Sequence, residues 1–199
     1  KEHPKIRRPK EKNLFQEALV RYRAGLLQEA EPLIQSHITR HPKDVEAVNL
    51  AGLIAYQFGH YDSAIPLFQS AIRLNDREHS YHNNLGAALK DSGELEEAIP
   101  CFQKAIDLNP DYCEASYNLG GSYQSLGELG HAIDWYEYTL SRNPEFYLAC
   151  SNLACIYKDQ GQIEKAIEGF RHVVQRSPND AVANSNLLFC LSYLEDVDH

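Results

Sequence analysis

Four asparagines recur along the chain at one constant interval, and their side chains could do hydrogen-bond chemistry. Asn84, Asn118, Asn152 and Asn186 follow one another at steps of 34 residues. Asparagine is a mediocre helix former, so helix propensity does not account for this recurrence. A carboxamide carries both a donor and an acceptor, so a row of them could pair with the N–H and C=O groups of an extended peptide. The pattern predicts recognition of peptide backbone with little sequence preference.

Polar residues also recur beside the asparagines at the same interval. One neighbouring row includes Asn83 and Tyr117, and another consists of Lys90, Gln124 and Lys158. We expect these rows to supply what specificity the surface has. A net hydrogen bond contributes only about 0.5–1.5 kcal/mol and association costs entropy, which predicts weak binding, roughly micromolar to millimolar. A second interpretation stays open, in which each asparagine ties one structural unit to the next.

Other candidates for chemistry in this sequence are weaker. The segment GGSYQ at 120–124 lacks the closing glycine of a nucleophile elbow and falls in a helical pattern. His79 and His82 are three residues apart, without the Cys, Asp or Glu pattern that would complete a metal site. Neither a P-loop nor a dinucleotide-binding glycine motif is present. We therefore predict no catalytic residue, no metal site and no cofactor, and expect that the chain is not an enzyme.

Other residues recur at the same 34-residue interval, and they show which structural elements position the asparagines. Glycine recurs at the same place in each period, alanine follows it by five residues, and a large apolar residue follows four positions later. The apolar residues on either side of each glycine have helical spacing, which predicts two amphipathic helices joined by a tight turn. The glycines are Gly25, Gly59, Gly93, Gly127 and Gly161, and the alanines are Ala30, Ala64, Ala98, Ala132 and Ala166.

This pattern resembles the tetratricopeptide repeat (TPR) family. The resemblance implies an all-α fold in which helix-turn-helix repeats stack into a right-handed superhelix, an α-solenoid whose first helices line a concave surface. We expect a basic N-terminal extension over 1–10, a superhelix over 11–194 and a tail over 195–199. The superhelix would contain five repeats and a final helix at 11–44, 45–78, 79–112, 113–146, 147–180 and 181–194.

Prolines occupy one place in the second helix of the first three repeats, at Pro32, Pro66 and Pro100. Proline is tolerated in the first helical turn, where its missing N–H has no helical partner. We therefore expect these three helices to begin late or to bend at the proline.

The end of the chain resembles a narrower group. The segment AVANSNLLFCLSYLEDVDH is similar to the last repeat helix of bacterial O-linked N-acetylglucosamine transferases and SPINDLY-like proteins. The asparagine row also resembles the asparagine ladder in the repeat region of those transferases, although the equivalent positions in repeats one and two hold Gln16 and Leu50. This resemblance implies a region that presents substrate polypeptide to a catalytic domain, and that domain is not in these residues.

Two other binding functions are weighed against substrate presentation. A free-standing scaffold that assembles a bacterial complex would use the same groove with a constitutive partner. A chaperone cofactor would clamp a C-terminal carboxylate with cations from consecutive first helices, and here Lys90 and Lys158 are far apart. In each case the partner is a protein or peptide.

Composition sets further expectations about partners and compartment. The net charge of -9 opposes binding to nucleic acid, and the sequence has no apolar run long enough to span a membrane. The five cysteines show no CxxC spacing and lie in helical patterns, which predicts reduced, structural thiols and a cytoplasmic protein. The absence of Met predicts a piece of a longer chain. Apolar residues of the final helix could form an exposed face through which copies associate: Leu187, Leu188, Phe189 and Leu191.

Overall fold

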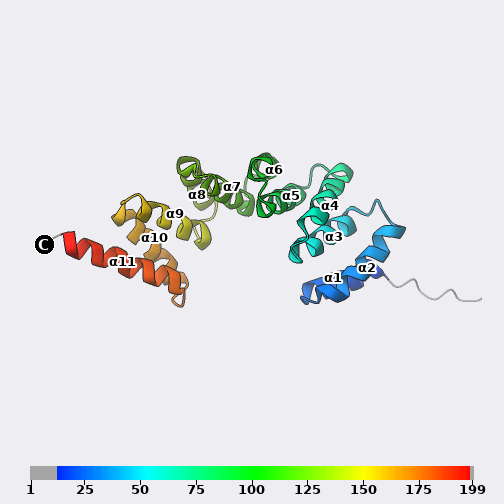
Figure 1. Cartoon of the computed structure of the whole chain (residues 1–199), viewed down its shortest axis with the longest axis horizontal. Helices are drawn as coiled ribbons and strands as arrows, with labels where there is room; N and C mark the ends of the chain where they lie inside the picture. Colours follow the sequence, from blue (N-terminus) through cyan, green and yellow to red (C-terminus); the bar gives the residue numbers. More distant parts are fainter. Residues whose placement is uncertain (1–12, 198–199) are drawn as a thin grey trace, which may run out of the picture. The chain divides into compact units, whose positions relative to one another are not determined.

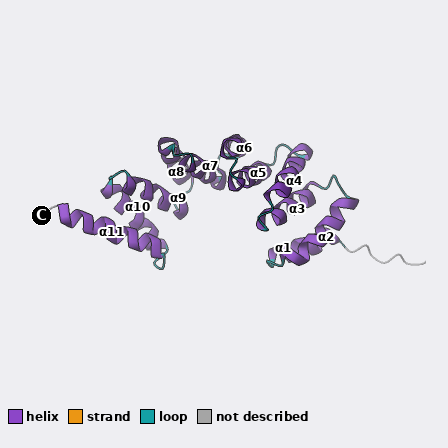
Figure 2. Ribbon diagram, viewed as in Figure 1, coloured by secondary structure: helices purple, strands orange, loops and turns teal. Residues whose placement is uncertain are grey.

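The described part of the chain is entirely helical. The computed structural model describes residues 13–197, with side chains described through residue 194. Within these residues there are eleven α-helices and no strand (Figure 1, Figure 2), which confirms the predicted all-α class. The expected N-terminal extension over 1–10 lies outside the described residues, as do positions 198 and 199 at the end of the expected tail.

The helices pair as first and second helices of successive repeats. In chain order they are α1 Leu14–Arg23, α2 Leu27–Arg40, α3 Val45–Gln57, α4 Tyr61–Leu74, α5 His79–Ser92, α6 Leu95–Leu108, α7 Cys113–Ser125, α8 Leu129–Arg142, α9 Tyr147–Asp159, α10 Ile163–Arg176 and α11 Ala181–Val197. Helices α1–α4 form one compact unit and α5–α11 a second. The last helix continues three residues past its predicted end at 194.

Each pair of helices is joined by a short turn that contains the recurring glycine. The five turn glycines all have positive φ angles, between 74° and 97°. Glycine reaches this left-handed region without the steric penalty that other residues meet, so its recurrence is required by the turn. The structure thus confirms the predicted tight turn between the helices.

The core of the first unit lies between its two helix pairs. Fully buried alanines at Ala18 and Ala30 let α1 and α2 approach closely, and Ile34 fills the space beside them. Residues of α3 complete the cluster, among them Leu50 and Ile54. Partly buried Leu67 from α4 packs against this cluster, so the second helix of one repeat covers the core of the repeat before it.

The second unit repeats this packing with aromatic side chains at the place that Phe68 has in α4 of the first unit. Phe102, Tyr136 and Phe170 occupy equivalent positions in three successive second helices, and all three are fully buried. Each such side chain contributes about 1.5–3 kcal/mol by leaving water. Helices in contact are neighbours or next neighbours in sequence, for example α6 with α7 and α5 with α7. Neighbouring repeats of this unit therefore stabilise one another.

The prolines correct one expectation from the sequence. Helices α2, α4 and α6 begin five residues before Pro32, Pro66 and Pro100, so they do not begin late. The equivalent helices α8 and α10 have no proline and begin at the same repeat position. Burial of an alanine on the N-terminal side of each proline and of Ile34, Phe68 or Phe102 on its other side stabilises the helix across it.

Candidate functional site

A polar groove crosses the second unit on the side of its first helices. Its volume is about 630 Å³, and its lining includes Lys90 and Asp91 of α5, Gln124 and Ser125 of α7, Tyr136 of α8 and Asn152 of α9. These side chains come from repeats three, four and five. Three of the predicted binding residues, Lys90, Gln124 and Asn152, are thus brought into one groove.

The tyrosine hydroxyl of Tyr136 joins two amides of this groove. It donates to Oε1 of Gln124 at 2.7 Å and accepts from Nδ2 of Asn152 at 3.1 Å. The ring is fully buried, and burial raises the pKa of Tyr136 to about 12. The hydroxyl therefore stays protonated at neutral pH and holds both amides in place.

A charged pair lies at the other end of the groove lining. Nζ of Lys90 is 3.8 Å from Oδ1 of Asp91, and both side chains are partly exposed. A partly exposed pair of this kind contributes little to stability. The groove thus combines one cation, one carboxylate and two side-chain amides within its lining.

Asn118 and Asn83 form a tie between repeats three and four. Nδ2 of Asn118 donates to Oδ1 of Asn83 at 3.0 Å, and Nδ2 of Asn83 is 3.5 Å from the hydroxyl oxygen of Tyr112. Asn83 is only 2% exposed. The geometry therefore favours a structural role for Asn83, since a ligand could reach it only after the tie opens.

Asn152 ties repeat five to repeat four in the same way. Besides its bond to Tyr136, its Nδ2 donates to the hydroxyl oxygen of Tyr117 at 3.4 Å. The Tyr117 ring lies against Tyr136 and Phe146, with centroids 5.8 and 5.3 Å away. Asn118 and Asn152 thus both bond a residue 35 positions earlier, in the preceding repeat. These bonds agree with the alternative interpretation of the sequence, in which each asparagine ties one structural unit to the next.

Asn186 and Lys158 connect α11 to α9. Nζ of Lys158 donates to Oδ1 of Asn186 at 3.4 Å, and Nδ2 of Asn186 is 3.9 Å from Sγ of Cys155. Lys158 also lies 3.4 Å from Asp159 and 5.9 Å from the centre of the Phe189 ring. Asn84, on α5, is half-buried.

The structure separates the predicted residues into two groups. Lys90, Gln124 and Asn152 line the polar groove, whereas the others are outside its lining. Tyr136 and Asp91 were not predicted as site residues. The repeat pattern gave a signal for Tyr136, because it stands where repeats two, three and five have phenylalanine at Phe68, Phe102 and Phe170. A hydroxyl added to one copy of a core position indicates a local polar partner.

The described residues provide little for other chemistry. No group of three His, Cys, Asp or Glu among them could hold a metal ion. Nε2 of His79 is 3.3 Å from Nδ2 of Asn109, and its ring packs on Tyr112. All five cysteines are free, and burial raises the pKa of Cys101 to about 11, so this thiol is a poor nucleophile at neutral pH. Between residues 13 and 197, no helix has the length and apolar character needed to cross a bilayer.

The final helix exposes several large apolar side chains. Leu188 is 68% exposed and Phe189 57%, and Val182 and Tyr193 are also exposed. The opposite side of α11 packs on the core, where Ala183 and Cys190 are fully buried. Only part of the predicted apolar face is therefore accessible, because Leu187 and Leu191 pack against the core cluster.

Comparison with protein families identifies the repeats. Tetratricopeptide repeat models match residues 15–79, 114–146 and 147–180, and a further TPR repeat model matches residues 88–127. Together these matches cover most of the chain, which is therefore a tetratricopeptide repeat protein. Proteins built from these repeats bind protein or peptide partners. The comparison with curated protein sequences found no match.

Solved structures with the same fold support this assignment. A crystal structure of MamA is 27% identical, with a TM-score of 0.73 over 82% of this chain and 96% of that one. YrrB, described as a TPR protein with an unusual peptide-binding site, is 21% identical with a TM-score of 0.68, covering 86% of this chain and 89% of its own. Pseudomonas aeruginosa pilF is 18% identical with a TM-score of 0.83, covering 93% of this chain and 84% of its own.

Proposed function

We propose that this chain is a binding module that holds an extended polypeptide segment of a partner protein in the polar groove of its second unit. The observation that carries the proposal is that Lys90, Gln124 and Asn152, from three successive repeats, line one groove. An extended segment leaves its backbone N–H and C=O groups free for these amides, whereas in a helix the same groups pair internally. The module needs no catalytic group, metal or cofactor for this function.

The hydrogen bonds within the groove determine which amide atoms face the ligand. Oε1 of Gln124 accepts from Tyr136, so its Nε2 group is the part of this amide that meets a peptide C=O. Both hydrogens of Asn152 Nδ2 are directed to Tyr117 and Tyr136, so its Oδ1 meets a peptide N–H. The two amides thus offer one donor and one acceptor, which matches the alternating groups of an extended backbone.

The remaining predicted residues support the groove in this proposal. Asn118 and Asn186 keep neighbouring first helices in register through their ties to repeats three and five. Lys158 donates to Asn186, Tyr117 accepts from Asn152, and buried Asn83 accepts from Asn118. Asn84 lies on the same helix as Lys90 and extends the polar surface of α5. Because few groups contact the ligand directly, we expect affinity in the micromolar to millimolar range.

The finer role of the module is a separate proposal. The final helix carries the SNLLF segment that resembles transferase repeat regions, which favours presentation of a substrate polypeptide to a glycosyltransferase domain. A cytoplasmic scaffold that assembles a complex is the other candidate, and MamA, YrrB and pilF provide the fold for it. An immunoblot of source cells separates the two, because a transferase requires a native mass well above 22.6 kDa.

The binding proposal is tested with peptides selected from a random twelve-residue phage library on the immobilised chain. Fluorescence anisotropy then measures the affinity of a selected peptide for the variant K90A/Q124A. We expect about tenfold weaker binding than for the unmodified chain, because a charge and an amide are lost from the groove. The matched control is Q103A, which removes an amide from α6 outside the groove lining.

Two outcomes bear on this proposal directly. Equal affinity of K90A/Q124A and the unmodified chain would place the peptide elsewhere and refute it. A peptide with an amidated C-terminus should bind as well as the free acid, because the groove reads backbone. If amidation abolishes binding, the chain is a carboxylate clamp and the backbone-reading groove is wrong.

A further inference from the structure

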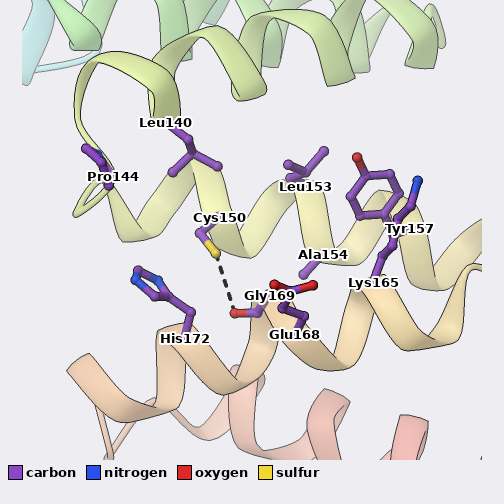
Figure 3. Close-up of a pocket in the computed structure, with 10 residues that line it drawn as sticks. All are labelled: Leu140, Pro144, Cys150, Leu153, Ala154, Tyr157, Lys165, Glu168, Gly169 and His172. Atoms are coloured by element: carbon purple, nitrogen blue, oxygen red, sulfur yellow. Dashed lines mark hydrogen bonds between the residues drawn. The ribbon is translucent and has the colours of Figure 1, made fainter.

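The second unit exposes apolar surface in two places, which lie on different faces. The first is a groove of about 460 Å³ between α8, α9 and α10. Figure 3 shows Leu140 of α8 and Leu153 of α9 above this apolar groove, and Gly169 of α10 below it. The groove is open because Gly169 has no side chain. The earlier repeats carry larger residues at the equivalent position, namely Leu33, Leu67, Cys101 and Trp135.

The second place is on α11, at positions that line the polar groove in repeat four. Phe189 is equivalent to Gly121, and Tyr193 is equivalent to Ser125. Gly121 and Ser125 both belong to the lining of the polar groove. Phe189 and Tyr193 are exposed. The side of the first helices that is polar over α5–α9 therefore continues onto α11 with aromatic side chains.

Val182 extends this apolar surface toward the start of α11. It precedes Phe189 by seven residues and Tyr193 by eleven, so the three exposed side chains share one face of the helix. These three residues are called the apolar stripe below. The core side of α11 is formed by fully buried Ala183 and Cys190. The stripe lies beside that buried side and is open to a partner.

Lys158 connects the polar groove to the apolar stripe. It stands in the same row as Lys90 and Gln124, two residues of the groove lining. Its Nζ lies 5.9 Å from the centre of the Phe189 ring and 3.4 Å from Oδ1 of Asn186. The two surfaces thus form one continuous face of the second unit, polar over α5–α9 and apolar on α11.

Charge favours an uncharged partner side chain at the stripe and disfavours a second copy of this chain. Between 181 and 194, α11 has no charged residue. Lys158, which contacts Phe189, is already paired with Asp159 at 3.4 Å. A charged partner side chain would therefore lose hydration at the stripe without gaining an ion pair. The net charge of -9 makes two copies of the chain repel each other.

We propose that the extended segment held in the polar groove continues over α11 and places a large apolar side chain, such as leucine, on the apolar stripe. This inference rests on the proposed function, because the same segment occupies both surfaces. Contact with Phe189 and Tyr193 removes apolar surface of both partners from water. The polar groove then binds backbone, and the stripe supplies the side-chain preference.

The packing of α9 and α11 determines where the apolar residue lies in the segment. The two helices contact each other, and packed helices have axes about 8–10 Å apart. An extended chain advances about 3.3 Å per residue. The apolar residue should therefore precede or follow the residue bound at Asn152 by roughly three positions.

The test uses peptides selected on the unmodified full chain from the random twelve-residue library. Fluorescence anisotropy compares a selected peptide with the same peptide carrying serine in place of its large apolar residue. We expect the unmodified chain to bind the serine peptide about tenfold more weakly, because its apolar contact is lost. The variant Phe189→Ser should bind the two peptides within about twofold of each other, since that contact is already absent.

Leu188→Ser is the matched control. Leu188 is 68% exposed and lies next to Phe189 on the same helix. It is equivalent to Gly120 and Ala154, which face second helices instead of the polar groove. We expect Leu188→Ser to keep the full preference for the apolar peptide. Thermal melting followed by circular dichroism verifies that both variants fold.

The results separate this inference from the proposed function. If K90A/Q124A weakens peptide binding and Phe189→Ser keeps the preference for the apolar peptide, the polar groove stands and the inference is overturned. If Phe189→Ser removes the preference and K90A/Q124A binds as well as the unmodified chain, the peptide does not occupy the polar groove, and both proposals fail.

Two further results would overturn the inference alone. Peptides selected on the unmodified chain should share a large apolar residue, and a set without one contradicts the role of the stripe. Analytical ultracentrifugation tests the second copy. If the unmodified chain self-associates and Phe189→Ser does not, another copy of the chain covers the stripe, and the partner segment is excluded from it.

Discussion

Repeats four and five have the same length and the same helix positions, yet they bring their helices together differently. In repeat four, Gly120 on the first helix faces the ring of Tyr136, and a Cβ on Gly120 would lie 2.8 Å from that ring. Trp135 then occupies the outer position. In repeat five the first helix carries Ala154, and the missing side chain is at Gly169 on the second helix.

In repeats two to five one glycine allows the close approach of the two helices, and the difference shows that this glycine can stand on either helix. In repeat four the absence on the first helix makes room for a tyrosine whose hydroxyl reaches the polar groove. In repeat five the absence on the second helix opens an apolar groove on the other side. Binding surfaces can therefore be changed by moving a single glycine within a repeat.

The largest expected effect comes from placing leucine at position 169 without compensation. Gly169→Leu should destabilise the chain by about 2–3 kcal/mol, because its Cβ meets Ala154 and the α9–α10 pair must separate. The second substitution in A154G/G169L should restore most of this loss. Urea unfolding followed by circular dichroism measures both.

A matched glycine variant shows whether this cost comes from packing. Gly130→Ala adds a side chain to a helix where a Cβ would meet no atom within 4 Å, so it should stabilise by about 0.5–1 kcal/mol. If Gly169→Leu proves as stable as the unmodified chain, repeat five does not depend on the exchanged glycine, and the contrast with repeat four is lost.

The next effect concerns the hydroxyl of Tyr136. Among the described repeats, only repeat four has a hydroxyl at this core position. Burial raises the pKa of Tyr136 from an unfolded value of about 10 to about 12. Between these values the unfolded state loses a proton that the folded state keeps, so the free energy of unfolding falls as pH rises. The contribution of Tyr136 to the free energy of unfolding is intact below pH 10 and is lost as the pH rises toward 12.

Tyr136→Phe should remove this pH-dependent contribution to stability. The variant has the residue that repeat five carries at the equivalent position, Phe170. Between pH 9 and pH 12 the unmodified chain should lose about 2 kcal/mol more stability than the variant. Urea unfolding at several pH values tests this, with Tyr193→Phe on the exposed side of α11 as control. Parallel pH profiles of Tyr136→Phe and the unmodified chain would contradict it.

The smallest effect separates a structural asparagine from a binding one. Asn118→Ala leaves buried Oδ1 of Asn83 without its donor, which should cost about 1 kcal/mol of stability. Gln124→Ala keeps that tie, so it should weaken binding of a selected peptide more than Asn118→Ala does. If Asn118→Ala weakens binding most and leaves melting unchanged, Asn118 is a peptide contact and the tie is unimportant.

Much of the fold follows from local sequence rules. The turn glycines were predictable because only glycine adopts a positive φ at low cost, and the 34-residue period places both helices of each pair. The late start predicted for the helices with Pro32, Pro66 and Pro100 was wrong, and the alternative of a bend at the proline stays a prediction. Local propensity favours a late start there, and burial of side chains on both sides of the proline outweighs it.

Less of the candidate site could be predicted. The spacing indicated that Lys90, Gln124 and Asn152 share a surface, and one groove indeed holds them. The bonds from Asn118 to Asn83 and from Asn152 to Tyr117 depend on the offset between adjacent repeats, which a single repeat does not reveal. The apolar groove depends on a pair of changes, at Ala154 and Gly169, whose meaning appears only when the helices are packed.

The restriction of contacts to neighbouring helices also has a kinetic consequence. Within each unit the main contacts of a helix are with helices one or two places away in the sequence, so native contacts close short loops. Chains with such low contact order fold on the microsecond to millisecond scale, since little loop entropy is lost before contacts form. Folding of the second unit can therefore start at any helix pair and spread in both directions.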